Sequence, residues 1–385
     1  MKPHAIHLFA ALALGTCCQA SIQAATQSAT QSAPVVLGKP GLSTYVTQVR
    51  ASADGTLCIA GQTMEPDGDL QSRGLLVLYS ISANRVLWQQ TVAAPDGNAA
   101  SRFVACRVHG KDVYVAANVD TPSEQSLNLG LAWVYRFGSD GKLLAQAELK
   151  PGAPNAFAYD IDAGADGVMV AGRTAEKGGK VQANAIFFAR LDPALKGAAF
   201  GKLATGAYLG GAVVRLSGGT AWLGGNFAPA HAAADALADD YAVSKIVAGK
   251  YQFSVRPQKG KAEDIATAIA PAGEIVSLGS AGKATHLTVV SADGKVKDDR
   301  QFAGAWCQTA SLSADAGTLY AVRSACGRSQ DPSRLVALDR RTGTETVVGG
   351  IAGEPQYVLA LDDGLVVISR KGNGSVLLQT LAKGR

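Results

Sequence analysis

One short pattern recurs along the chain and constrains its fold more than any other feature. In residues 166–174, DGVMVAGRT, a turn precedes an alternating apolar run that ends in Ala-Gly and a polar residue. Related runs begin at seven positions: Leu57, Val113, Val168, Ala221, Ile275, Leu319 and Leu365. Their successive spacings are 56, 55, 53, 54, 44 and 46 residues. A repeat of this length built from short strands indicates radial β repetition rather than a helical solenoid.

Each repeat contains four strand-like segments. In the third repeat they are residues 156–163, 167–172, 185–192 and 198–203, which are rich in Val, Ile and Phe and are bounded by Gly, Asp and Pro. Four antiparallel strands form one blade of a β-propeller. The seven repeats therefore predict an all-β, seven-bladed propeller over residues 33–385.

The last repeat is one strand short, because the chain ends soon after residues 375–382. Residues 33–38, APVVLG, precede the first repeat and belong to none. We predict that residues 33–38 pair with residues 375–382 and close the ring, since an open blade would expose an unpaired strand edge. The alternative is that residues 33–38 are linker.

The N-terminus has the pattern of an export signal. Lys2 gives a positive start, and the apolar residues 5–15 are too few to span a bilayer. Residues 1–25 are therefore predicted to be a cleaved signal peptide, and residues 26–32 a polar linker. This pattern predicts a periplasmic or secreted protein with no transmembrane segment. The alternative is an outer-membrane lipoprotein modified at Cys17.

Removal of the signal leaves four cysteines, Cys58, Cys106, Cys307 and Cys326. An even number in an exported chain predicts two disulfides. Cys307 and Cys326 are each nine residues from the turn at residues 316–317, so an antiparallel hairpin would place them opposite each other. Cys58 then pairs with Cys106 by exclusion and joins neighbouring blades. The alternative is that Cys58 and Cys106 are buried free thiols.

Parts of the repeats resemble those of known bacterial propellers. Residues 166–172, followed by FFARLD at 187–192, resemble delta-60-type repeats, and residues 334–343, RLVALDRRTG, resemble a pyrroloquinoline-quinone-type repeat. Only Trp88 occupies the outer-strand position where quinoprotein repeats often carry tryptophan. The chain is also similar in size and export to the outer-membrane barrel-assembly propeller lipoprotein, which has eight repeats. These resemblances imply an exported bacterial propeller and assign no substrate.

The chain shows no catalytic signature. Its net charge of +5 is spread over interspersed acids and bases, which argues against nucleic-acid binding. Neither a Gly-x-Ser-x-Gly elbow nor a phosphate-binding loop occurs. His109 and His286 fall in different repeats and are interpreted as surface or structural residues. No cofactor is expected.

One Ala-rich insert, residues 228–241, has the spacing of a metal site. His231, Asp235 and Asp239 are four residues apart and would share one face of a helix. Such a face could hold a divalent metal. The alternative is the solvated face of a short surface helix, because a metal site usually needs more ligands and groups that orient them.

The innermost strands of a propeller begin, and the second strands end, at one end of the central channel, which we call the channel mouth. Six of the seven innermost strands begin with an aromatic residue, although only 6% of the chain is aromatic. Aromatic rings beside polar groups suit a peptide or a carbohydrate. The alternative is that the rings fill the spaces between blades. The predicted binding residues are Tyr45, Arg102, Phe103, Phe157, Tyr159, Arg173, Tyr208, Asn226, Asp264, Trp306, Tyr357 and Arg370.

The leading functional hypothesis is an exported binding or scaffold protein that presents the channel mouth to a protein, peptide or glycan in the bacterial envelope. The second is a propeller enzyme, either a quinone- or metal-dependent oxidoreductase or a lyase. An enzyme would require titratable groups such as Arg102, Asp160, Arg173 and Asp264 to converge. The third is a lipid-anchored assembly scaffold, tethered through Cys17.

Overall fold

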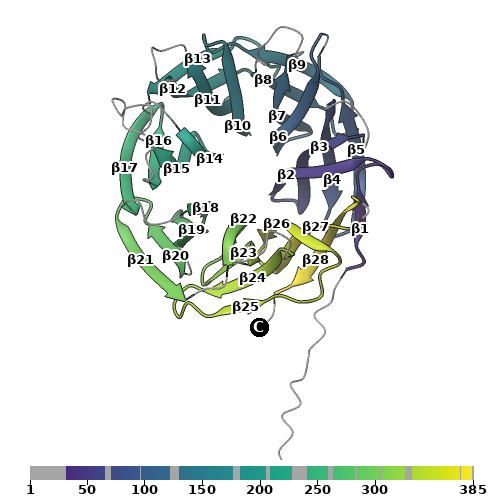
Figure 1. Ribbon diagram of the computed structural model, residues 1–385. Coiled ribbons are helices and arrows are strands. Elements are labelled where there is room, and N and C mark those ends of the chain that lie inside the picture. The colour runs from purple at the N-terminus through teal and green to yellow at the C-terminus, as the bar shows by residue number, and fades with distance from the viewer. Residues whose placement is uncertain are drawn as a thin grey trace, which may run out of the picture.

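The chain forms seven four-stranded antiparallel sheets arranged as blades in a ring, as Figure 1 shows in a view along the ring axis. The computed structural model describes residues 32–65, 71–95, 97–121, 130–176, 183–204, 209–227, 241–258, 263–281, 284–303, 306–325, 332–372 and 374–383. All the elements in these residues are strands, and none is a helix that could cross a membrane. The predicted all-β, seven-bladed architecture is confirmed.

The first four blades follow the chain from the innermost strand outward. Blade 1 is β2 (Ser43–Ala51), β3 (Thr56–Met64), β4 (Ser72–Ser80) and β5 (Arg85–Val92). Blade 2 is β6 (Ala100–His109), β7 (Asp112–Asp120), β8 (Gly130–Phe137) and β9 (Leu143–Leu149). Blade 3 is β10 (Asn155–Gly164), β11 (Gly167–Glu176), β12 (Ala183–Leu191) and β13 (Ala199–Ala204). Blade 4 is β14 (Leu209–Ser217), β15 (Thr220–Phe227), β16 (Tyr241–Val247) and β17 (Lys250–Gln258).

The last three blades complete the ring. Blade 5 is β18 (Glu263–Ile269), β19 (Ile275–Ala281), β20 (Ala284–Val290) and β21 (Val296–Ala303). Blade 6 is β22 (Trp306–Ala314), β23 (Thr318–Ala325), β24 (Arg334–Asp339) and β25 (Glu345–Val347). Blade 7 is β26 (Glu354–Ala360), β27 (Gly364–Arg370), β28 (Val376–Ala382) and the N-terminal β1 (Val35–Leu37).

Strand β1 closes the ring as the fourth strand of blade 7. It pairs antiparallel with β28, with Val35 opposite Leu378 and Leu37 opposite Val376. Ser32 extends the contact, because its hydroxyl and the Thr380 hydroxyl lie 2.7 Å apart. The predicted pairing of residues 33–38 with residues 375–382 is therefore confirmed.

The shape of the innermost strands explains why each repeat has small residues, such as Ala-Gly, near the end of its second strand. All seven carry a register shift near the channel mouth, for example between Val46 and Gln48 in β2. At such a bulge, a backbone carbonyl of the innermost strand points toward the second strand of the same blade. A Cβ on Gly61 would overlap the carbonyl of Tyr45, and one on Gly172 would overlap that of Phe157. A small residue is therefore needed beside the bulge.

Blade 6 departs from this rule with a buried arginine. Its innermost strand has two register shifts, and Arg323 takes the place of the small residue. Arg323 donates to Glu345 at 2.6 Å and to the Thr285 hydroxyl of blade 5 at 2.8 Å. Burial lowers the pKa of its guanidinium, and Glu345 opposes that shift. The ion pair lies within blade 6, and the hydrogen bond from Arg323 to Thr285 joins it to blade 5.

Apolar clusters between adjacent blades form the core. One cluster joins blades 1 and 2 through Phe103, Tyr135 and Phe137, whose ring centroids lie 5.2 to 6.4 Å apart. Phe103 occupies the space that a side chain on Gly74 would need. Among the described residues, the cluster between blades 4 and 5 has three buried members, Val243, Ile275 and Val290. Stability therefore comes from wedge-like contacts between neighbouring blades.

The Cys58–Cys106 disulfide joins β3 of blade 1 to β6 of blade 2 across this core, as predicted. Cys326 and the side chain of Cys307 lie outside the described residues, so their bond stays a prediction. The two register shifts in β22 remove the simple hairpin symmetry on which that prediction was based, because Trp306 pairs with Ala325 and Gln308 pairs with Ser324. Cys307 lies at the first of these shifts, between the two pairs.

Loss of the Cys58–Cys106 bond should lower stability. The bond closes a loop with a sequence separation of 48 residues, and the chain-entropy model assigns about 4 kcal/mol to it. We expect a reductant to lower the free energy of unfolding by about this much more in the wild type than in a Cys58→Ala/Cys106→Ala variant, measured by denaturant titration. The comparison cancels the effect of any other disulfide. Equal sensitivity to the reductant would contradict the prediction.

Candidate functional site

Four side chains from three neighbouring blades form a continuous row at the channel mouth. The Arg370 guanidinium of blade 7 lies 4.2 Å from the ring centroid of Tyr45 in blade 1. Tyr45 pairs in register with Gln62, whose Oε1 accepts from Arg102 Nε of blade 2 at 2.9 Å. We call Arg370, Tyr45, Gln62 and Arg102 the mouth row. It exists because innermost strands begin and second strands end at the same end of the ring.

The mouth row combines positive charge with an accessible aromatic ring. Tyr45 is 36% exposed, and the Arg102 side chain is exposed. Within the described part of the chain, neither Arg102 nor Arg370 forms an ion pair with a carboxylate. A hollow of about 450 Å³ lies nearby at the same end of blade 1 and brings in Lys39 and Arg73.

Two predicted mouth aromatics serve packing between blades instead. Phe103 is 0% exposed and fills the space beside Gly74, so no ligand can reach it. Phe157 is half-buried and occupies the equivalent space beside Gly130 in blade 2. Its ring also carries the Arg173 guanidinium at 5.1 Å. The packing alternative therefore holds for Phe103 and accounts for part of Phe157.

The other predicted residues do not join the mouth row. Tyr159 packs against the apolar cluster between blades 3 and 4. Trp306 is half-buried, and its carbonyl accepts from Arg323 at 3.4 Å. Tyr357 lies deeper, where its hydroxyl donates to the carbonyl of Val49 at 3.4 Å. Tyr208 and the side chains of Asn226 and Asp264 lie outside the described residues.

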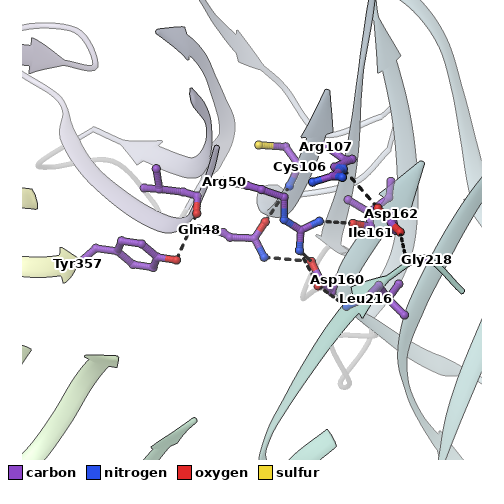
Figure 2. A network of polar contacts seen from close by, with 11 residues as sticks. Gln48, Arg50, Cys106, Arg107, Asp160, Ile161, Asp162, Leu216, Gly218 and Tyr357 are labelled. Carbon is purple, nitrogen blue, oxygen red and sulfur yellow. Dashed lines mark hydrogen bonds and ion pairs between the residues drawn. The ribbon is translucent and has the colours of Figure 1, made fainter. Parts of the chain in front are cut away.

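Asp160 forms a buried polar centre in the channel wall. Its side chain is 0% exposed and belongs to β10 of blade 3. Its carboxylate accepts from Arg50 Nη2 at 2.8 and 2.9 Å and from Gln48 Nε2 at 3.0 Å, both in blade 1. It also accepts from the backbone N–H of Leu216 in blade 4 at 2.8 Å. Figure 2 shows these donors converging on it.

Gln48 and Arg50 extend this centre to further backbone groups. Gln48 Oε1 accepts from the N–H of Cys106 in blade 2 at 3.2 Å, and Arg50 Nη1 donates to the carbonyl of Ile161 at 2.6 Å. One carboxylate, one amide and one guanidinium thus connect the innermost strands of blades 1 to 4. A buried carboxylate saturated by three donor groups has a structural role, not that of an exchangeable acid or base.

Sequence reasoning named Asp160, and Gln62 among the polar ends of the second strands, but missed Gln48 and Arg50. The available signal was the register of the repeat, because Gln48 and Asp160 occupy equivalent positions opposite Ala60 and Ala171. A comparison of the residues at this register position in different blades would have shown that polar residues occupy it in blades 1 and 3. The partners at this position could not be read, since they lie 112 residues apart.

The described residues contain no group of three His, Cys, Asp or Glu side chains that could hold a metal. His231, Asp235 and Asp239 lie outside the described part of the chain. His286 is buried, and its Nε2 lies 2.6 Å from Asp299 Oδ1 in the neighbouring strand. This pair lies on blade 5, away from the mouth row.

Comparisons with known proteins show the fold alone. No protein-family model matches the chain, and no curated protein sequence matches it. A hydrazine synthase structure from Kuenenia stuttgartiensis aligns with a TM-score of 0.54 at 14% identity, covering 91% of this chain and 98% of that one. The polysaccharide lyase Uly1 aligns with a TM-score of 0.53 at 11% identity, covering 87% and 89%.

A third structure is the acylaminoacyl peptidase of Pyrococcus horikoshii, with a TM-score of 0.49 and 10% identity. The alignment covers 85% of this chain, which spans about half (49%) of the peptidase chain. The hydrazine synthase and the polysaccharide lyase are named for different chemistries. Their likeness therefore supports the propeller fold and assigns no activity.

Neutralising Asp160 should destabilise the ring. Asp160→Asn leaves Arg50 buried without its counter-charge, and breaking a buried ion pair costs about 3–5 kcal/mol. We expect a loss of this size in the free energy of unfolding, measured by denaturant titration. The control is Asp166→Asn, because Asp166 is exposed at the end of the same hairpin, and it should change stability by less than about 0.5 kcal/mol. Equal effects of the two substitutions would show that Asp160 contributes nothing special.

Proposed function

We propose that this protein is an exported binding protein of the bacterial envelope that holds an acidic peptide segment at its channel mouth. The observation that carries the proposal is the mouth row. It places Arg102 and Arg370, whose guanidinium groups have no carboxylate partner among the described residues, on either side of Tyr45 and Gln62. Guanidinium groups form strong charge-assisted hydrogen bonds with carboxylates, so a ligand carrying carboxylates at intervals matches this surface.

The rest of the end adds to this match. The hollow on blade 1 contributes Lys39 and Arg73, and Arg173 lies over Phe157 in blade 3. Lys39, Arg73 and Arg173 thus add positive groups on blades 1 and 3 to the arginines of the mouth row, with Glu65 beside them in the hollow. An extended peptide fits a surface of this kind because alternating side chains can meet successive blades. Tyr45 offers a partly exposed ring for apolar contact with the same ligand.

The enzyme hypothesis has less support. Asp160, the carboxylate named for it, is fully buried and saturated by Arg50, Gln48 and Leu216. The proposal that the protein is exported rests on the signal pattern of residues 1–25. The N-terminal and C-terminal strands of the mature chain would then pair in blade 7. We also propose that the protein acts in the periplasm or outside the cell; lipidation at Cys17 is the alternative, in which it is anchored to the outer membrane.

Substitutions in the mouth row should weaken binding of an acidic peptide. The probe is a hexaglutamate peptide, and calorimetry measures its affinity for wild type, Arg102→Ala and Arg370→Ala. Each substitution removes a charge-assisted contact, so we expect each to weaken binding by about tenfold or more. The weakening should shrink in high salt, because screening reduces the contribution of exposed charges.

The matched control is Arg85→Ala, an exposed arginine on β5 at the outer circumference, which should bind the peptide as the wild type does. An oligogalacturonate of similar charge tests the glycan alternative. Tighter binding of the glycan with the same dependence on Arg102 and Arg370 would replace the peptide as ligand. Equal binding by all three variants would refute the role of the mouth row.

A further inference from the structure

The seven innermost strands place one residue each at an equivalent register position beside the channel. Each lies two residues nearer the far end than the level of Gln48 and Asp160, and opposite the second residue of the repeated apolar run. We call this set the channel ring. Its members are Arg50, Arg107, Asp162, Arg215, Ala268, Ser313 and Leu359.

Charge in the channel ring is not balanced. Arg50 is paired with Asp160, and Arg107 Nε lies 3.3 Å from Asp162 Oδ1. The backbone N–H of Gly218 donates to the other Asp162 oxygen at 2.8 Å. Arg215 has no hydrogen bond or ion pair with any residue that the structure describes, so its guanidinium is the unpaired positive charge of the ring.

Arg215 lines a cavity in the channel whose wall has both charged and apolar residues. The cavity has a volume of about 290 Å³, and its lining includes Arg50 of blade 1 and Arg215 of blade 4. Ala268, Ile269 and Leu359 are the apolar part of its lining. Pockets for small ligands are typically apolar, with a few polar groups that orient the ligand, and this volume is near the lower end of their range.

A hydroxyl also borders the cavity. Ser313 Oγ accepts from the backbone N–H of Ala360 at 2.8 Å, which leaves its hydrogen available for donation. An arginine fork and a hydroxyl donor together suit the two oxygens of a carboxylate. The apolar lining residues Ala268, Ile269 and Leu359 can contact a short hydrocarbon or aromatic body, whereas they form no hydrogen bonds with a fully hydrated ion.

We propose that this channel cavity binds a small carboxylic acid with an apolar body. Arg215 binds the carboxylate, and Ala268, Ile269 and Leu359 contact the body. The site is distinct from the mouth row, because its members lie toward the opposite ends of the innermost strands. The proposal therefore stands whether or not an acidic peptide binds at the mouth.

The experiment measures benzoate binding to the full mature chain by saturation-transfer NMR and calorimetry. Benzamide, which has the same body without the charge, is the matched probe. We expect wild type to bind benzoate and not benzamide, Arg215→Gln to weaken benzoate binding by about tenfold or more, and Arg215→Lys to weaken it less. Arg85→Gln is the control and should bind as the wild type does.

Weaker benzoate binding by Arg215→Gln can be distinguished from a loss of folding. Arg215 has no partner in the described residues to lose, so Arg215→Gln should keep its melting temperature within about 2 °C of wild type. Absence of benzoate binding to the wild type, or equal affinity in Arg215→Gln, would overturn the site. Binding of inorganic phosphate as tightly as benzoate would overturn the assignment to an acid with an apolar body. Loss of peptide binding at the mouth row with intact benzoate binding would refute only the function proposed above.

Discussion

The junction of blades 7 and 1 depends on the closure of the ring by β1 and β28. The strands are far apart in sequence, and the three residue pairs between them complete blade 7 with an N-terminal strand. Closure brings β26 beside β2, where the Tyr357 hydroxyl reaches the Val49 carbonyl. An open ring would leave blades 7 and 1 without the apolar cluster that they share. It would also separate Arg370 from Tyr45 and so divide the mouth row.

Within the closed ring, buried charged groups join the blades at two places. The innermost strands of blades 1 to 4 share the buried carboxylate of Asp160. Arg323 of blade 6 is buried, and it joins blade 5 by donating to the Thr285 hydroxyl while it pairs with Glu345 of its own blade. The wall of the channel is therefore charged on the side of blades 1 to 4, whereas Ala268 and Leu359 make the side of blades 5 and 7 apolar. This uneven wall is what makes the cavity at Arg215 chemically selective.

The sequence by itself determined the local features. Seven repeats, four strands in each, the closing strand at residues 33–38 and the Cys58–Cys106 pair follow from hydrophobic alternation and counting, because these act over a few residues or by exclusion. Only the tertiary structure decided which side chains meet. Phe103 fills a gap beside Gly74, whereas Tyr45 at the equivalent end of blade 1 is exposed under Arg370. The bulge in each innermost strand shifts the register by one residue or more, and that shift sets which residues face the channel. Arg215 became distinctive only when closure placed it in a ring whose other two arginines already have carboxylate partners from another blade.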